Sequence, residues 1–212
     1  MCFKIMDILI VSLIVLLFFA GVWYFFGQGI YNTNIISQVQ AGTVETTMQE
    51  QQKTEVSYTG WIIIDDFNPY GKEKVIFVKG SEDTTLACPA LVIDAHTNSL
   101  LVKVDTFGNQ EIIPISNIPT KKWLHFAIVL NEHYLKVYIN GIEHTSKYLT
   151  MLPKSNTAQV LVSPKGGFSG RITKFNTYSK SLEYDEITKL SKDVPSTGDV
   201  VPPYFDISWL KS

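Results

Sequence analysis

The sequence predicts an all-β domain, either a sandwich or a barrel, carried behind a single transmembrane helix. From residue 56 onward, short runs rich in β-branched and aromatic residues are separated by turn residues. Their spacing of about 8–12 residues is typical of sandwiches and barrels. Before that, one apolar run is long enough to cross a bilayer. These observations divide the chain into an anchor (1–27), a polar stalk (28–55), the β domain (56–192) and a C-terminal tail (193–212).

The composition is that of a globular domain with one added apolar segment. Of the 212 residues, 45 % are hydrophobic and 18 % are charged, and the formal net charge is -2. This near-neutral balance gives no indication of nucleic acid as a partner. Cys2 and Cys88 lie on opposite sides of the apolar run, which excludes a disulfide framework, and no Cys/His cluster has the spacing of a metal site.

The predicted anchor is the uncharged run of 19 residues from Ile8 to Phe26. A helix of this length spans the hydrocarbon core, which is about 30 Å thick. A cleaved signal peptide is the alternative, but it would have a shorter apolar part and a small-residue cleavage site, whereas this run ends in VWYFF. Lys4 precedes the run and the next lysine is Lys53. The positive-inside tendency therefore predicts a single-pass protein with a cytoplasmic N-terminus and its domain on the other side.

The segment from residue 28 to residue 55 is rich in Gln, Thr and Glu and poor in large apolar residues. We interpret it as a stalk, because it lacks the wide apolar face of a packed helix. A short helix over its latter half is the alternative.

The β domain contains nine candidate strands and one helix. Tyr134–Asn140 alternates strictly, which predicts a strand with one face on the core and one in water. Trp123–Asn131 is apolar on both faces and is predicted to be central. The helix over 181–192 has Ser181 as its N-cap, with acids in its first turns and lysines at its end, which complement the helix dipole. The other candidate strands are Val56–Ile64, Lys74–Val78, Ala90–Asp94, Ser99–Asp105, Gln110–Ile115, Ala158–Ser163 and Gly170–Tyr178.

Several segments of this domain resemble laminin-G-like domains, and they occur in the family's order. KKWLHFAIVLNEHYLKVYINGIE resembles the Trp-x-His…Tyr-x-Asn-Gly hairpin of that family, and GGFSGRITKFNTYSKSLEYDEITKL resembles its closing segment. Upstream, YTGWIIIDDF and KVIFVKG are similar to its opening strands. The resemblance runs from about Val56 to Lys192 and implies the concanavalin A-like lectin/glucanase fold, in which two antiparallel sheets form a jelly roll with one concave face.

Three features of these segments acquire a role in such a sandwich. Trp61 and Trp123 are predicted to fill the space between two sheets about 10 Å apart. The Asn140-Gly141 pair suits a tight turn that needs positive φ. His125 lies two residues from Trp123 on the same face, and we predict a hydrogen-bonded structural histidine there rather than a catalyst.

The sequence lacks the residues of an enzyme. Catalytic members of this superfold resemble glycanases and carry Glu and Asp at alternating positions of one strand. The nearest acidic pair here, Asp65-Asp66, stands at a strand end and faces two directions. There is also no Gly-x-Ser-x-Gly motif, phosphate loop or His-rich zinc site. We therefore predict a protein that is not an enzyme and has no catalytic cofactor.

Calcium is the one cofactor that the resemblance leaves open, because many relatives bind it at the sandwich rim through Asp, Asn and carbonyl oxygens. No spacing singles out a set of ligands, and acids at strand ends are usually just solvated. The candidates at predicted strand ends and loops are Asp65, Asp66, Asp83, Asp94 and Asp105.

One strand face is a candidate ligand surface. Tyr134, Lys136 and Tyr138 share the face predicted to be wet. Aromatic rings stack on sugar rings, so this face is a candidate platform for a glycan, and it suits a protein partner equally well. Cross-strand pairing on an exposed sheet explains the same pattern without a ligand.

The tail is a candidate partner surface. Three prolines keep it extended, and it ends in YFDISWL. Buried aromatic residues dominate interface energies, so we expect Tyr204, Phe205 and Trp209 to pack against their own sandwich or another subunit.

Two functional hypotheses follow. The first is a non-enzymatic, membrane-anchored attachment module that links a membrane to the neighbouring subunits of a protein shell. The absence of Asn-x-Ser/Thr sequons and the dominance of lysine, with Arg171 the single arginine, are compatible with a minor capsid protein of a large DNA virus with an internal membrane. The alternative is a carbohydrate-binding lectin or adhesin on a cell or envelope surface.

Overall fold

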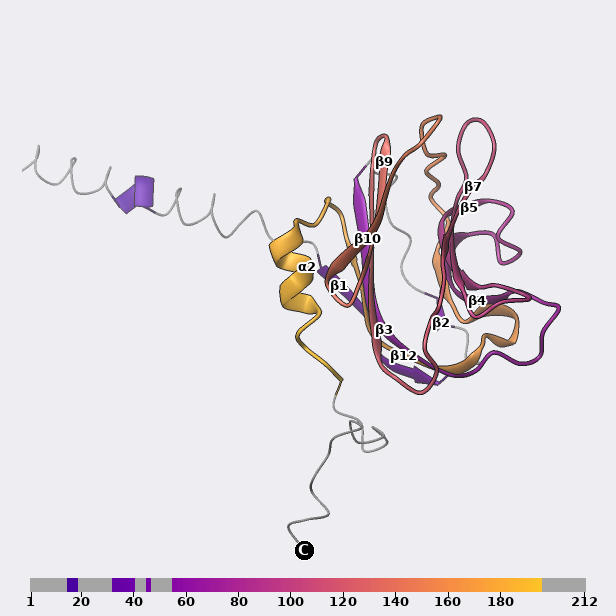
Figure 1. Ribbon diagram of the computed structural model, residues 1–212. Helices are drawn as coiled ribbons and strands as arrows, with labels where there is room; N and C mark the ends of the chain where they lie inside the picture. Colours follow the sequence, from indigo (N-terminus) through magenta and orange to yellow (C-terminus); the bar gives the residue numbers. More distant parts are fainter. Residues whose placement is uncertain (1–14, 19–31, 41–44, 47–54, 196–212) are drawn as a thin grey trace, which may run out of the picture. The chain divides into compact units, whose positions relative to one another are not determined.

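A computed structural model describes residues 15–18, 32–40, 45–46 and 55–195 (Figure 1). Residues 15–18 are helical. Among the described residues, no helix is both long and apolar enough to cross a membrane. The rest of the predicted anchor at 8–26 lies outside the described residues, and so do Tyr204, Phe205 and Trp209 of the tail.

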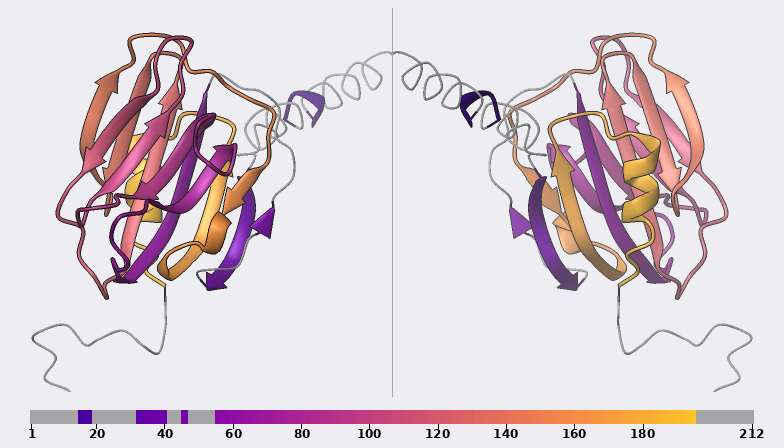
Figure 2. Two further views of the ribbon diagram at one scale, coloured as in Figure 1. Left: turned by 90° about the vertical axis from the view of Figure 1, so that its right-hand side faces the viewer. Right: turned by 90° about the vertical axis from the view of Figure 1, so that its left-hand side faces the viewer.

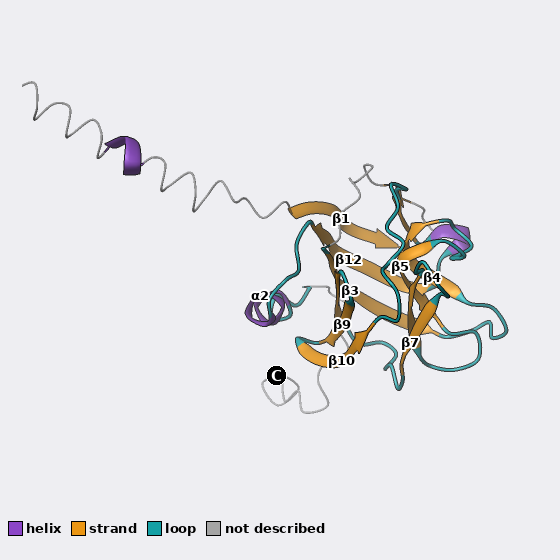
Figure 3. Cartoon of the chain, turned by 90° about the horizontal axis from the view of Figure 1, so that it is seen from above, coloured by secondary structure: helices purple, strands orange, loops and turns teal. Residues whose placement is uncertain are grey.

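Two six-stranded sheets face each other in the β domain (Figure 3). Wherever the register of two strands is defined, they run antiparallel, which confirms the predicted two-sheet sandwich. The first sheet has the order β1 (Asn32–Gln40), β12 (Ser169–Tyr178), β3 (Val56–Asp66), β8 (Leu124–Asn131), β9 (Tyr134–Ile139) and β10 (Ile142–Tyr148). The second sheet has the order β2 (Glu45–Thr46), β11 (Val160–Val162), β4 (Lys74–Gly80), β5 (Ala87–Ile93), β6 (Leu100–Val104) and β7 (Glu111–Ile115).

Two of these strands lie in residues 28–55, the segment whose composition predicts a stalk. β1 is hydrogen-bonded to β12 at the edge of the first sheet, and β2 pairs with β11 at the edge of the second. Part of the predicted stalk therefore belongs to the sandwich, because a polar strand can complete a sheet edge through its backbone alone.

The space between the sheets is filled by four aromatic rings. Phe77 of β4 stands at their centre, with its ring centroid 5.4 Å from that of Tyr58, 5.9 Å from Phe126 and 4.9 Å from Phe175. Each of the four side chains is fully buried. Together with the aliphatic side chains around them they form the main core of the domain.

The two tryptophans predicted for this space lie elsewhere. Trp61 is buried but faces away from the main core, where its ring meets that of His125 edge-on at 5.2 Å. Trp123 precedes β8 and is half-buried, with the guanidinium of Arg171 at 6.0 Å from its ring. The prediction was wrong because a strand that is apolar on both faces does not reveal which face meets the other sheet. His125, predicted to be a hydrogen-bonded structural histidine, is buried, but its Nδ1 has no hydrogen-bond partner among the described residues.

The outer face of the first sheet is covered by α2 (Tyr184–Leu190) and the segment before it (Figure 2, right view). Ile187 of α2 and Leu182 pack on Tyr138 and on Ala127 and Val129 of β8. The helix is shorter than predicted, and its N-cap is Glu183 rather than Ser181.

The segment before α2 is fixed to the sheet by one side chain. Ser57 of β3 donates from its hydroxyl to the carbonyl of Lys180 at 2.7 Å and accepts from the backbone N–H of Leu182 at 2.9 Å. A short 3-10 helix, η1 (Pro164–Gly166), lies between β11 and β12. The predicted Asn140-Gly141 turn is confirmed, with φ of 51° and 80°.

Candidate ligand-binding groove

A groove of about 360 Å³ runs along the outer face of the first sheet, where the segment before α2 lies against β9. Three strands form its floor, and the start of α2 forms its far wall. Its lining residues are Val129 and Asn131 of β8, Tyr134, Lys136 and Tyr138 of β9, Glu143 of β10, and Ser181, Leu182, Glu183 and Tyr184.

The three residues singled out from the sequence, Tyr134, Lys136 and Tyr138, all line this groove. They share one face because Leu135 and Val137 between them point into the main core. Tyr134 is 49 % exposed, Lys136 is half-buried and Tyr138 is buried. Their role in binding stays a prediction.

Cross-strand pairing also holds this face together. Tyr134 lies opposite Tyr148 in the β9–β10 register, and their rings meet edge-on at 4.9 Å. The ring of His133 stacks on the ring of Tyr148, and their centroids are 5.4 Å apart. These contacts fix the orientation of the Tyr134 ring in the groove lining, so pairing and ligand contact are compatible uses of one side chain.

The floor of the groove is polar at one point. The hydroxyl of Tyr138 donates to a carboxylate oxygen of Glu143 at 3.2 Å. Burial, and after it the charge of Glu143, raise the pKa of Tyr138 to about 12. The phenol is therefore neutral at physiological pH and is a hydrogen-bond donor, not a base.

The far wall adds two residues that were not among the predicted site residues. Tyr184, in the first turn of α2, is 55 % exposed, and its ring centroid lies 6.5 Å from that of Tyr138. The side chain of Glu183 accepts from the backbone of Glu186 in a capping box, so this carboxylate is held at the helix N-terminus. No local pattern marks Tyr184 as a site residue, because only the packing of α2 on the sheet brings it to the groove.

Such a lining combines exposed aromatic rings with hydrogen-bonding groups. Tyr134 and Tyr184 come from different elements and offer flat apolar surfaces, while Lys136, Asn131 and Glu143 offer donors and acceptors. A pyranose ring has an apolar face and a rim of hydroxyls, so its chemistry matches this arrangement.

The acidic pair Asp65-Asp66 has no feature of a catalytic pair. Both residues are exposed at the end of β3. The carboxylate of Asp66 accepts from the backbone N–H and the side-chain amide of Asn68, both at 2.9 Å, and these bonds hold the pKa of Asp66 below its usual value. A general acid needs a raised pKa, so Asp66 serves to fix its own turn.

Two of the other aspartates considered for calcium behave in the same way. Asp83 accepts from the hydroxyl of Thr85 at 2.7 Å, and Asp94 accepts from that of Thr97 at 2.6 Å. Within the described ranges, no three Asp, Glu, His or Cys side chains gather as metal ligands would. The five candidate aspartates are therefore not brought together as a set.

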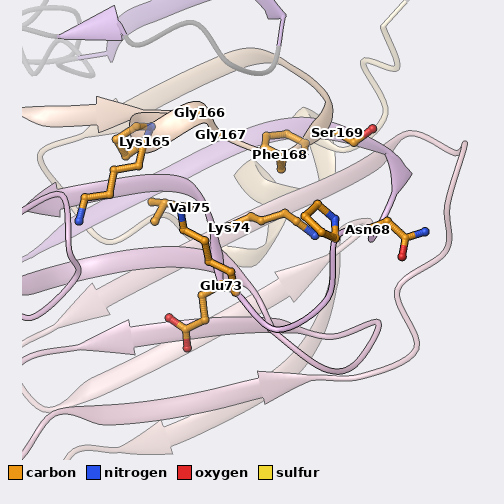
Figure 4. A pocket seen from close by; sticks show the side chains of 12 residues that line it. Asn68, Glu73, Lys74, Val75, Lys165, Gly166, Gly167, Phe168 and Ser169 are labelled. Atoms are coloured by element: carbon orange, nitrogen blue, oxygen red, sulfur yellow. The ribbon is translucent and has the colours of Figure 1, made fainter.

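A second hollow of about 350 Å³, the rim pocket, lies where the β3–β4 connection meets η1 (Figure 4). Two of its four ionic side chains have structural partners. Lys74 donates from Nζ to the carbonyl of Phe67, and Glu73 pairs with Lys103 at 2.5 Å. In Figure 4 the side chains of Lys74 and Lys165 point in different directions. We therefore take the groove, and not the rim pocket, as the candidate site.

Comparisons with known proteins agree with the fold. The family model Laminin_G_3, described as the concanavalin A-like lectin/glucanases superfamily, matches residues 38–188. Among curated proteins, none matches the chain. The match to the family model begins inside β1, in agreement with the place of that strand in the sandwich.

Solved structures with a similar fold include binding domains of botulinum neurotoxins. The serotype D binding domain is 16 % identical, with a TM-score of 0.59 over 78 % of this chain and 44 % of that one. The binding domain of botulinum neurotoxin DC in complex with rat synaptotagmin II is 15 % identical, with a TM-score of 0.55 over 76 % and 48 %. A structure of botulinum neurotoxin type C, whose cell entry depends on interaction with two ganglioside molecules, is 16 % identical, with a TM-score of 0.56 over 76 % and 43 %. The chain thus spans less than half of each, and at these identities the likeness is one of fold.

Proposed function

Because the chain belongs to the concanavalin A-like lectin/glucanases superfamily, we propose that its sandwich is a non-enzymatic binding module whose groove along β9 takes a saccharide unit of a glycan. The proposal depends most on two half-exposed tyrosines, Tyr134 of β9 and Tyr184 of α2, that line the same groove. Stacking on two aromatic faces, with Lys136 and Glu143 placed for hydroxyl groups between them, is the chemistry of sugar recognition.

The charges of the lining favour an uncharged saccharide. Glu143 and Glu183 contribute two carboxylates against the single ammonium of Lys136. An anionic sugar would meet a net negative lining, and like-charge contacts lower affinity. The proposed ligand is therefore a neutral hexose or N-acetylhexosamine unit.

The second part of the proposal is a membrane location. Residues 8–26 carry no charge, and the apolar side chains described within them, at 15–18, are between 47 % and 68 % exposed on a helical turn. This exposure suits a lipid environment. We place the sandwich on the non-cytoplasmic side of that membrane as a single-pass protein. A capsid role has no support from the family or from the similar structures, and we do not carry that hypothesis forward.

The groove is tested with the full-length chain in detergent micelles on an array of neutral and acidic glycans. Tyr134→Ala and Tyr184→Ala should each weaken binding to neutral glycans at least about fivefold, because each removes one stacking face. Tyr70→Ala is the matched control, since Tyr70 is 57 % exposed and lies outside the groove. Binding that survives both groove substitutions, or an array with no bound glycan, would refute the saccharide site.

A further inference from the structure

Three large apolar side chains gather at one end of the sandwich. Phe107, in the β6–β7 connection, is 66 % exposed, and Met151 and Leu152, which follow β10, are 50 % and 47 % exposed. We call these three residues the apolar tip. Exposed apolar groups in a cluster, unlike scattered ones, mark an interaction surface.

The two loops that carry the apolar tip are bound to each other. The backbone N–H of Phe107 donates to the carbonyl of Leu152 at 3.0 Å, and the N–H of Lys154 donates to the carbonyl of Asp105 at 2.8 Å. Thr106 and Pro153 form a bridge between these bonds. The tip is thus presented by a paired backbone, so its three side chains are already arranged before any partner arrives.

The Phe107 loop is also fixed internally. The hydroxyl of Thr106 donates to the carbonyl of Asn109 at 2.7 Å and accepts from the N–H of Gly108 at 3.1 Å. Met151 covers Gly108 closely: a Cβ at that glycine would lie 3.1 Å from Met151 Cγ. The apolar surface of the tip is therefore continuous from one loop to the other.

One tyrosine and two lysines flank Met151 and Leu152 in the sequence. Tyr148, three residues before Met151, is 58 % exposed. Lys154 is exposed beside it, and Lys147, 40 % exposed, pairs with the buried Glu111 at 2.7 Å. Apolar side chains bordered by tyrosine and lysine are typical of protein surfaces that lie in the headgroup region of a bilayer.

At the opposite end of the sandwich, Tyr70 and Ile142 are 57 % and 70 % exposed. Charged side chains are exposed there as well, at Asp65 and Asp66 in the last residues of β3 and at Lys72, Lys121 and Lys122 in the loops. The apolar tip differs in that its three apolar side chains are held together by two loops that are hydrogen-bonded to each other.

We propose that the apolar tip is a membrane-contact surface, through which the sandwich lies against the bilayer that holds residues 8–26. This inference rests on the membrane part of the proposed function. Between Phe26 and the start of β1 at Asn32 there are only five residues, which reach about 20 Å when fully extended. A domain on so short a connection stays within reach of the bilayer surface.

The test uses the full-length chain with Cys2→Ser, reconstituted in phosphatidylcholine vesicles, with a spin label on Met151→Cys. The remaining Cys88 is buried. Power-saturation spectroscopy compares collisions of the label with oxygen, which concentrates in lipid, and with a water-soluble nickel chelate. We expect the label at 151 to collide severalfold more with oxygen than with the chelate. A label on Ile142→Cys, 70 % exposed at the other end, should show the reverse.

Flotation of the vesicles separates this inference from the anchor. A chain that floats with its vesicles but has a water-accessible label at 151 retains the anchor and overturns the membrane contact. A chain that does not float refutes the anchor, and the inference with it, while the glycan assay still stands on its own. A label at 151 shielded from both reagents indicates a protein contact and also overturns the proposal.

Discussion

At the scale of single residues, His125 couples the stability of the fold to pH. Its ring is buried against Trp61, and burial lowers the pKa of His125 to about 4. In the unfolded chain the same group titrates near pH 6.5, so between about pH 4 and 6.5 the unfolded state binds more protons. Stability therefore rises with pH in this window and is lost on acidification. Between pH 7 and pH 5 we expect the free energy of unfolding to fall by about 2 kcal/mol, as measured by urea unfolding at both values.

The matched pair His125→Gln and His96→Gln isolates this effect. Gln carries no proton at either pH, so His125→Gln should abolish most of the loss. His96 is exposed in a loop, and its replacement should leave the loss intact. A His125→Gln variant with the same pH dependence as the unaltered chain would show that His125 does not carry it.

At the scale of elements, Gly141 lies where the β9–β10 turn packs closely against the C-terminal end of α2. Its φ is +80°, and a Cβ there would overlap Ser191 Oγ and lie 3.1 Å from Ser191 Cβ. Gly141→Ala should therefore lower the free energy of unfolding by at least about 3 kcal/mol, from backbone strain and overlap together. Gly71→Ala is the control, because Gly71 has φ +92° and nothing within 4 Å, so only strain of about 1–2 kcal/mol applies. Equal losses in urea unfolding, or no partial rescue of Gly141→Ala by Ser191→Gly, would contradict this packing.

The same elements show which parts of the secondary structure the local sequence pattern can predict. The strand predicted over Tyr134–Asn140 matches β9 within one residue, because its alternation reports the core face. The other face was predicted to be wet, but α2 covers part of it and Tyr138 is buried there. β10 was not among the predicted strands, because most of its residues are exposed and no alternation marks it. The N-cap was misplaced at Ser181 because a serine before acidic residues is the usual signal, whereas Glu183 completes a capping box with Glu186.

At the scale of the whole molecule, the two-sheet sandwich could be predicted from the sequence, but the packing of α2 on its outer face could not. Regular spacing of apolar strands and turns predicts two sheets, and the hairpin motif points to the family that the comparison identifies. Three of the groove residues were predictable from the strict alternation of one strand. Tyr184 and Glu183 were not, since their place depends on α2 folding back across more than forty residues of sequence onto β9.

The boundary of the folded unit is the remaining prediction. β1 and β2 complete the two sheets beside β12 and β11, so a fragment of residues 32–195 should fold as a monomer with a β-type circular-dichroism spectrum. A fragment of residues 55–195 lacks both strands. The backbone N–H and C=O groups on the outer edge of β12 are then unpaired and open to association with other chains. We expect the shorter fragment to lose about 2 kcal/mol or more in its free energy of unfolding and to form oligomers on size-exclusion chromatography. If both fragments are monomeric and equally stable, β1 and β2 are not part of the cooperative unit, and the sandwich begins at β3.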